Sequence, residues 1–198
     1  MSFKSISNRQ PTGDSHRFSR WLTVLLILVA VGGIDQMTKG LALRFLATDT
    51  APRPLLGSYV TLHLTHNPGA ALSIGQGQTL VVTIFSLILV FVPTVLSFLT
   101  RSRTWAYVLA VVSGGGLANL VDRFQGPTWG TGEVVDFIDY FGWFVGNVAD
   151  IFVVVGVAVI FVLLLRGVPL FAHPQPESAS RRAEAGADPD CSVKDKDS

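Results

Sequence analysis

The chain has 198 residues, of which 49% are hydrophobic and only 15% are charged, and its net charge is +1. A soluble domain is usually about 25% charged, so the composition indicates a membrane protein and not a large water-soluble core. The charge balance gives no reason to expect nucleic acid as a partner. The single cysteine, Cys191, excludes an intramolecular disulfide. The scattered histidines lack metal-ligand spacing, so we expect no metal and no cofactor.

Four segments are long and apolar enough to span a bilayer, which takes about 20 residues per helix. They cover approximately residues 21–43, 80–99, 105–121 and 144–165. The first is not a signal peptide, because Asp35 and Lys39 follow its apolar run and the apolar pattern then resumes. These two residues are four apart on one helical face, where an intrahelical ion pair is possible. The sequence predicts an all-α membrane protein with four transmembrane helices.

The segment 44–79 also carries a strand pattern. Residues 58–67 read SYVTLHLTHN, in which β-branched and apolar residues alternate with period two. Asn67-Pro68-Gly69 favours a turn, and ALSIG (71–75) could return as a second strand. We expect a small extracytoplasmic β-sheet over about 52–76, within an ordered domain of residues 19–168. The polar termini, 1–18 and 169–198, are expected to be disordered.

Lysine and arginine predict the orientation, because cytoplasmic loops carry more of them. Eleven basic residues border the ends expected inside: Lys4, Arg9, Arg17, Arg20, Arg101, Arg103, Arg166, Arg181, Arg182, Lys194 and Lys196. The other side has only Arg44, Arg53 and Arg123. Both termini are therefore predicted to be cytoplasmic, and segments 44–79 and 122–143 face outward.

Several polar residues lie in or beside the spans, and each has two interpretations. Asp35 and Lys39 could form only a structural ion pair, and Asn67 could be only a turn residue. In SGGGLANLVDRF (113–124), the glycines favour close helix contacts. Asn119 and Arg123 share a helical face, whereas Asp122 and Arg123 could simply mark the interface. The alternative is that these groups gather at one depth to form a site.

The strongest functional signal is a pair of acids around the start of the fourth span. Asp136 precedes the span and Asp150 lies in its first turns. If the intervening loop folds back, the two carboxyls meet, and they then share a proton because both cannot ionise cheaply. The charged carboxyl would activate a water and the protonated one would donate to a peptide carbonyl. No GxSxG or HExxH motif supports a serine or zinc peptidase.

Five blocks in this sequence, taken in order on the four-span frame, resemble the bacterial lipoprotein signal peptidases, also called type II signal peptidases. The blocks are DQMTK (35–39), HNPGAALSI (66–74), GGGLANLVDRF (114–124), EVVDFID (133–139) and NVADIFVVVG (147–156). The resemblance covers about residues 21–166. It implies an aspartic endopeptidase of the bacterial inner membrane, active near the outer surface. We expect it to be a monomer, although the sequence leaves the oligomeric state open. The implied partners are membrane lipid and a prolipoprotein, cut before a diacylglyceryl-modified cysteine.

Carried over by motif, the resemblance places the catalytic pair on Asp136 and Asp150, the same two acids. It leaves Asp139 outside the pair, as a surface acid. Supporting roles are implied for Asp35, Lys39, Asn67, Asn119, Arg123 and Asn147. We expect Asn147 and Arg123 to orient the pair or the scissile peptide, Asp35 and Lys39 to hold the first span, and Asn67 to anchor the outer sheet.

The sequence departs from the family pattern at three places. Ala118 stands where the family usually has glycine, Gly146 stands where it usually has phenylalanine, and the loop 124–133 is longer. Rival classes fit the acids less well. A transporter or proton channel would place them near the bilayer midplane, as would a presenilin-like protease. A structural subunit would not need two acids, asparagine and arginine at one level.

Overall fold

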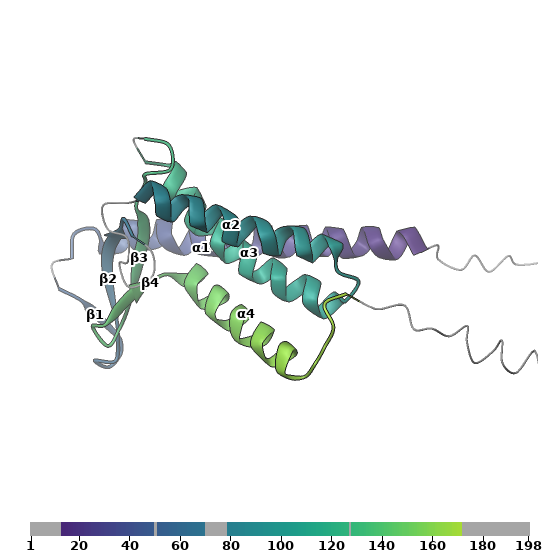
Figure 1. The fold of residues 1–198 in the computed structure, drawn as a ribbon. Coiled ribbons are helices and arrows are strands. Elements are labelled where there is room, and N and C mark those ends of the chain that lie inside the picture. The colour runs from purple at the N-terminus through teal and green to yellow at the C-terminus, as the bar shows by residue number, and fades with distance from the viewer. Residues whose placement is uncertain (1–12, 50, 70–78, 127, 172–198) are drawn as a thin grey trace, which may run out of the picture.

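The computed structural model describes residues 13–49, 51–69, 79–126 and 128–171. Within these residues, four helices are long and apolar enough to cross a membrane (Figure 1). They are α1 (Gly13–Leu46), α2 (Thr79–Leu99), α3 (Arg103–Phe124) and α4 (Val148–Leu165). The predicted four-span architecture is therefore confirmed.

Helix α3 packs against the other three helices, and consecutive glycines allow each of them to come close. A Cβ atom on Gly114 would lie 2.9 Å from the Cβ of Val31 on α1. One on Gly115 would lie 2.7 Å from the carbonyl oxygen of Ala149 on α4, and Gly116 is equally close to a valine of α2. Side chains at these positions would push the helices apart, so the glycine run sets the spacing of the bundle.

The outer faces of α2 and α4 are apolar. Leu89, Phe91, Val154 and Phe161 each have more than 60% of their surface exposed. In water such faces would be unfavourable, but in hydrocarbon they are stable, and helices satisfy their own backbone hydrogen bonds there. The buried interior of the bundle instead contains polar side chains, among them Asp35, which is fully buried.

An antiparallel sheet of four strands, counted over the described residues, covers one end of the bundle in the order β1-β2-β3-β4. Its strands are β1 (Arg53–Leu56), β2 (Val60–Asn67), β3 (Val134–Tyr140) and β4 (Phe144–Gly146). It lies where α1 ends and α4 begins (Figure 1). Residues of α1 hold it in place, since Ala42 and Leu46 pack against Phe137 and Ile138 of β3.

The sheet confirms the expected strand at 58–67 but is larger than predicted. Segment 134–146 was expected to be a loop running into a helix from Phe144; this was wrong, and α4 begins only at Val148. A tight turn at Phe141-Gly142 reverses the chain, with positive φ at both residues and a 3.0 Å bond from the Trp143 N–H to the Tyr140 carbonyl. This turn pairs β3 with β4, and the apolar side chains that suggested a helix are strand residues.

The start of the first helix also differs from the expected boundary. Helix α1 begins at Gly13, so residues 13–18, expected to belong to a disordered N-terminus, are helical. The possible strand at ALSIG (71–75) lies outside the described residues, as do residues 1–12 and 172–198 of the termini.

Candidate active site

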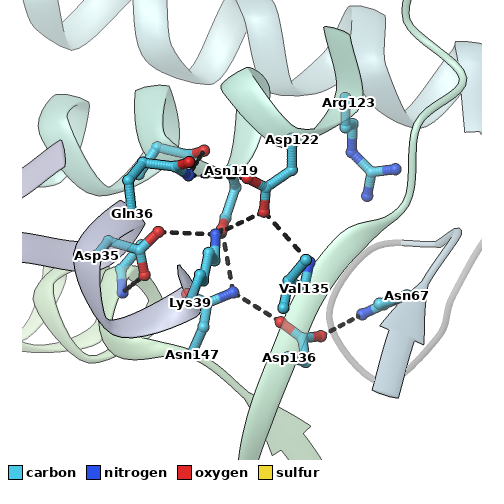
Figure 2. A network of polar contacts seen from close by, with 12 residues as sticks. Asp35, Gln36, Lys39, Asn67, Asn119, Asp122, Arg123, Val135, Asp136 and Asn147 are labelled. Carbon is cyan, nitrogen blue, oxygen red and sulfur yellow. Dashed lines mark hydrogen bonds and ion pairs between the residues drawn. The ribbon is translucent and has the colours of Figure 1, made fainter. Parts of the chain in front are cut away.

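Polar side chains from α1, α3, β2, β3 and the start of α4 converge beneath the sheet (Figure 2). Several of them are almost inaccessible to solvent: Asp35 and Asn147 at 0%, Asp136 and Lys39 at 2%, and Arg123 at 3% exposed surface. Buried polar groups are stable only when they are hydrogen-bonded or paired with opposite charge. The contacts of each group therefore indicate what it does in this cluster.

Asp136 is positioned by strand pairing. Strand β3 pairs with β2 so that Asp136 lies opposite Thr65 and Val134 lies opposite Asn67. The Asn67 side-chain amide then donates a 3.0 Å hydrogen bond to Asp136 Oδ2. Asn67 also accepts from the Gly69 N–H at 2.9 Å, which is the turn role its sequence suggested. Asn67 therefore both forms the turn and contacts Asp136.

Asp150 is positioned by the cap of α4. Asn147 is the N-cap, and its side-chain oxygen accepts from the Asp150 N–H at 3.1 Å. Asp150 Oδ2 accepts from the Asn147 N–H at 3.0 Å, which completes a reciprocal capping box. A carboxyl group in the first turn also lies at the positive end of the helix dipole. The Asn-x-x-Asp spacing thus fixes one carboxyl oxygen of Asp150 against the start of its own helix.

Two asparagines connect the two acids. The Asn147 amide nitrogen donates to Asp136 Oδ1 at 2.6 Å and to Asn119 Oδ1 at 3.0 Å. The Asn119 amide nitrogen donates to Asp150 Oδ1 at 3.0 Å. Between these two described carboxyl groups there is no direct hydrogen bond. Every contact that these two carboxyl groups make here comes from an N–H donor, so none of these partners could accept a proton carried by either carboxyl.

Lys39 is the central cation of the cluster. Its ammonium lies 2.7 Å from Asp35 Oδ2 and 2.7 Å from Asp122 Oδ2, and it donates to Asn119 Oδ1 at 2.8 Å. The predicted Asp35–Lys39 ion pair is confirmed. Asp35 Oδ1 also accepts from the Ala149 N–H at 2.8 Å, which ties α1 to the first turn of α4. The pair therefore connects the helix that carries Asp150 to the rest of the bundle.

Arg123 holds the backbone of two neighbouring segments. Its guanidinium donates to the carbonyl oxygens of Pro68, Gly69 and Gly132. In the described structure it forms no hydrogen bond or ion pair with Asp136 or Asp150, and Figure 2 draws no contact between it and Asp136. The geometry thus gives Arg123 a place beside the site, clamping the chain after β2 against the chain before β3.

Two cavities open on either side of the acids. A cavity of about 330 Å³ is lined by Asn67, Asp136, Asp139, Trp143 and Phe144, among others. A second, of about 340 Å³, is apolar except for Asp150 and is lined by Tyr140, Phe144, Ile151, Val154 and Val155. Phe144 lines both, so its ring separates a polar cavity from an apolar groove. Each cavity contains one of the two acids.

Burial makes Asp136 an unusually weak acid. Burial raises the pKa of Asp136 to about 6, while the hydrogen bond from Asn67 lowers it and the nearby charge of Asp150 raises it. A carboxyl group that titrates near neutral pH can both give and accept a proton under working conditions.

In the described residues, no group of three His, Cys, Asp or Glu side chains is arranged to hold a metal ion.

The raised pKa of Asp136 has a measurable consequence for the stability of the fold. Because the folded-state pKa of about 6 lies above the ordinary 3.8, the folded chain binds more protons than the unfolded chain between these values. The ionised Asp136 carboxylate therefore lowers the free energy of unfolding, and this effect reaches its full size above pH 6. It disappears as the pH falls toward 4. From pH 7.5 to 4, we expect the free energy of unfolding of the wild type to rise by up to about 3 kcal/mol relative to Asp136→Asn. Equal pH dependence of the two proteins in detergent would contradict the buried carboxyl.

A family model described as "Signal peptidase (SPase) II" matches residues 26–166, which includes all of the cluster above. The chain belongs to the signal peptidase II family. Many curated relatives carry the name lipoprotein signal peptidase. One from Bifidobacterium longum subsp. infantis is 38% identical over 141 residues, covering 71% of this chain and 76% of the relative. One from Rhodococcus jostii is 40% identical over 149 residues, covering 72% and 74%.

Two solved structures of bacterial membrane enzymes share this fold. One has a TM-score of 0.63 at 24% identity, covering 78% of this chain and 94% of the other, and supports the fold alone. A second has a TM-score of 0.58 at 28% identity, covering 72% and 92%. The chain is therefore a multi-pass membrane protein of a peptidase family.

Sequence reasoning missed two members of the cluster. Asp122 was weighed as an interface marker or as one of the polar groups of a site but was given no role, yet it is paired with Lys39 and accepts hydrogen bonds from Gln36 at 2.8 Å and from the Val135 N–H at 3.2 Å. Gln36 was not singled out at all. A signal existed: Asp122 is three residues from Asn119 on α3, and Gln36 is three from Lys39 on α1, so each shares a helical face with a residue already identified.

Of the departures from the family pattern, Gly146 has a local explanation in the structure, whereas nothing in the structure explains the alanine at position 118. Ala118 is buried at 1% exposure, and its carbonyl accepts from Gln36 at 3.1 Å. At Gly146, a Cβ atom would lie 2.7 Å from the Phe144 ring and 2.8 Å from Asp150 Oδ2. The Phe144 ring thus takes the space that a larger residue at 146 would need.

Gly146→Ala should therefore disturb Asp150. The added methyl would force the carboxyl to rotate or the ring to move, and a misplacement near 1 Å costs an enzyme about 100-fold. We expect kcat to fall by about tenfold or more while the thermal unfolding temperature changes little. Gly33→Ala is the matched control, because its Cβ would meet nothing within 4 Å. Equal activity of the two variants would contradict the contact at Gly146.

Proposed function

We propose that this protein is a membrane-embedded aspartic endopeptidase that removes the signal peptide from prolipoproteins. The observation that carries the proposal is the pair Asp136 and Asp150, bridged by Asn147 and Asn119 and placed between a polar cavity and an apolar groove. Membership of the signal peptidase II family supports the substrate class. The names of the relatives, lipoprotein signal peptidases, support it as well.

The proposed chemistry uses the two acids as one unit with a single proton. The ionised carboxyl removes a proton from a water, whose oxygen attacks the peptide carbonyl carbon. The protonated carboxyl donates to the carbonyl oxygen, so that a neutral tetrahedral intermediate forms. Its collapse breaks the C–N bond, and the amine leaves with a proton from the pair. No covalent bond to the enzyme is made at any step.

The remaining cluster residues are proposed to position this unit. Asn67 and Asn147 hold Asp136, and Asn119 holds Asp150. Lys39 pairs with both Asp35 and Asp122 and so reduces the negative charge that they add to that of the pair. Arg123 forms no hydrogen bond with either acid. It holds the chain after β2 against the chain before β3, and in this way supports the pair indirectly. In this proposal the protein acts as a monomer.

The two cavities suggest how a lipid-bearing substrate would bind. The polar cavity beside Asp136 suits a peptide backbone, while the apolar groove along α4 suits the acyl chains of a diacylglyceryl cysteine. Phe144 lies between them, so the scissile bond before the cysteine would reach the acids as the lipid enters the groove. Acyl chains can remain at bilayer depth because Val154 and Val155 lie within the membrane-spanning helix.

We place the protein in the bacterial inner membrane with both termini cytoplasmic and the sheet outside. In Figure 1 the start of α1 and the end of α4 lie at the end of the bundle opposite the sheet. That end carries Arg17, Arg20, Arg101, Arg103 and Arg166. The excess of basic residues at this end supports a cytoplasmic location.

A reconstituted cleavage assay tests the proposal. The wild type in liposomes, with a chelator present, should cut a prolipoprotein that carries diacylglycerol on its cysteine, leaving that cysteine at the new N-terminus. A substrate with this cysteine replaced by serine has no lipid, so we expect its kcat/KM to be at least about 100-fold lower, because the acyl chains supply much of the binding energy. Equal cleavage of both substrates would contradict the role of the apolar groove. No cleavage by folded enzyme would contradict the peptidase itself, and proton flux would then support a transporter.

A further inference from the structure

Exposed aromatic side chains cluster at one end of the sheet. Tyr59, in the β1–β2 turn, is 67% exposed, and Phe141 and Trp143, in the β3–β4 turn, are 60% and 88% exposed. The Phe141 ring centroid lies 5.7 Å from that of Tyr59 and 6.4 Å from that of Trp143. We call these three residues the aromatic tip. Single exposed apolar residues are ordinary, but a contiguous cluster marks an interaction surface.

The backbone of the aromatic tip is strained at Phe141. Phe141 has φ of +59° and is the only residue other than glycine with positive φ in the described chain. This conformation is rare for a bulky side chain, and asparagine is favoured at such turn positions. The Phe141 N–H also donates to the Tyr59 carbonyl at 2.8 Å, which joins the two turns. A large apolar ring at a position that favours asparagine points to a function on the surface.

The position of the tip identifies its partner. In Figure 1 the turns of the sheet project to one side of the helix ends, past the start of α4. Beneath them the apolar groove lined by Tyr140 and Phe144 runs onto Ile151 and Val154 of α4, so the apolar surface continues from the spans toward the tip. Exposed Leu55 and Leu56 on the neighbouring edge strand extend it. Tryptophan and tyrosine prefer the boundary between headgroups and acyl chains.

We infer that the aromatic tip inserts into the interface of the lipid leaflet on the sheet side. Trp143 and Gly142 also line the polar cavity that contains Asp136. Insertion of the tip therefore fixes the height of that cavity above the leaflet. The inference stands independently of the proposed peptide cleavage, because it requires only the membrane and the exposed side chains.

Depth-dependent fluorescence tests the insertion in the full chain. Cys191→Ser removes the native thiol, and Trp143→Cys then takes an environment-sensitive nitrobenzoxadiazole label. Glu133→Cys is the matched control, since it is exposed and lies just before the other end of β3. In phosphatidylcholine–phosphatidylglycerol vesicles, we expect blue-shifted emission and about threefold stronger quenching by brominated acyl chains at position 143 than at 133.

A second substitution separates the ring from the fold of the turn. Phe141→Asn keeps a residue that accepts positive φ, so the turn should form while the central ring is lost. We expect this variant to lose most of the blue shift at position 143. Water-like emission at 143 in the unsubstituted tip, equal to that at 133, would overturn the inference and would indicate that the tip is free to bind a macromolecule.

Discussion

Replacing either Asp136 or Asp150 by asparagine is expected to abolish cleavage of a prolipoprotein, with a fall of at least about a thousandfold in kcat. Asparagine keeps the size of the side chain but can neither accept nor release a proton. Both positions receive N–H donors from Asn147, Asn67 or Asn119, so one of these contacts would also be lost. The rates should be measured with a single lipid-modified substrate, and folding checked by thermal unfolding in the same detergent.

Asp139→Asn is the matched control for both variants. Asp139 lies on the same strand as Asp136, lines the same polar cavity, and accepts from Thr61 at 3.3 Å and from the Gly142 N–H at 2.9 Å. It has no contact with Asn147 or Asn119 in the described structure. We expect its rate to stay within a few-fold of the wild type, about the effect of a surface change. A loss of activity in Asp139→Asn as large as in Asp136→Asn would contradict the assignment of Asp136 and Asp150 alone as the catalytic pair.

Lys39→Met is expected to destabilise the protein by about 3–5 kcal/mol. The substitution preserves much of the side-chain volume but leaves the carboxyls of Asp35 and Asp122 buried without their cation. The remaining charges would also lie close to Asp150, whose helix start depends on Asp35. Unfolding in a graded denaturing detergent, followed by circular dichroism, measures the change.

Arg53→Met provides the comparison for the lysine. Arg53 forms an ion pair with Asp49 on α1's C-terminal side, but its side chain is 56% exposed. Exposed ion pairs contribute little to stability because water screens them, so this variant should unfold close to the wild type. If Lys39→Met were no less stable than Arg53→Met, the cluster would not depend on its buried cation.

The membrane architecture could be predicted from the sequence because its signals are local. Spans follow from runs of apolar residues, and the Asp35–Lys39 pair follows from a spacing of four on one helix. Asn147 and Asp150 are also a local pair, since three residues separate a cap from its partner. In each case the residues that interact are neighbours in the chain, so the sequence contains the geometry.

What could not be predicted depends on contacts between distant segments. Strand β3 exists because β2, about 70 residues earlier, pairs with it, as the bond from Asn67 to Asp136 shows. The same holds for Asp122, whose burial depends on Lys39 of another helix. Arg123 was expected to orient the acids or the scissile peptide. Its carbonyl partners could not be predicted, because they come from chain segments whose positions no local pattern gives.

The central claim is that Asp136 and Asp150 work as one acid–base unit. The most direct test compares the single-turnover cleavage rates of Asp136→Asn, Asp150→Asn and the double variant, using a radiolabelled lipid-modified substrate so that small residual rates remain measurable. For residues acting as a unit, the account predicts that the double variant is no slower than the slower single variant, within about threefold. Losses that multiply in the double variant, or a single variant with near wild-type rate, would contradict it.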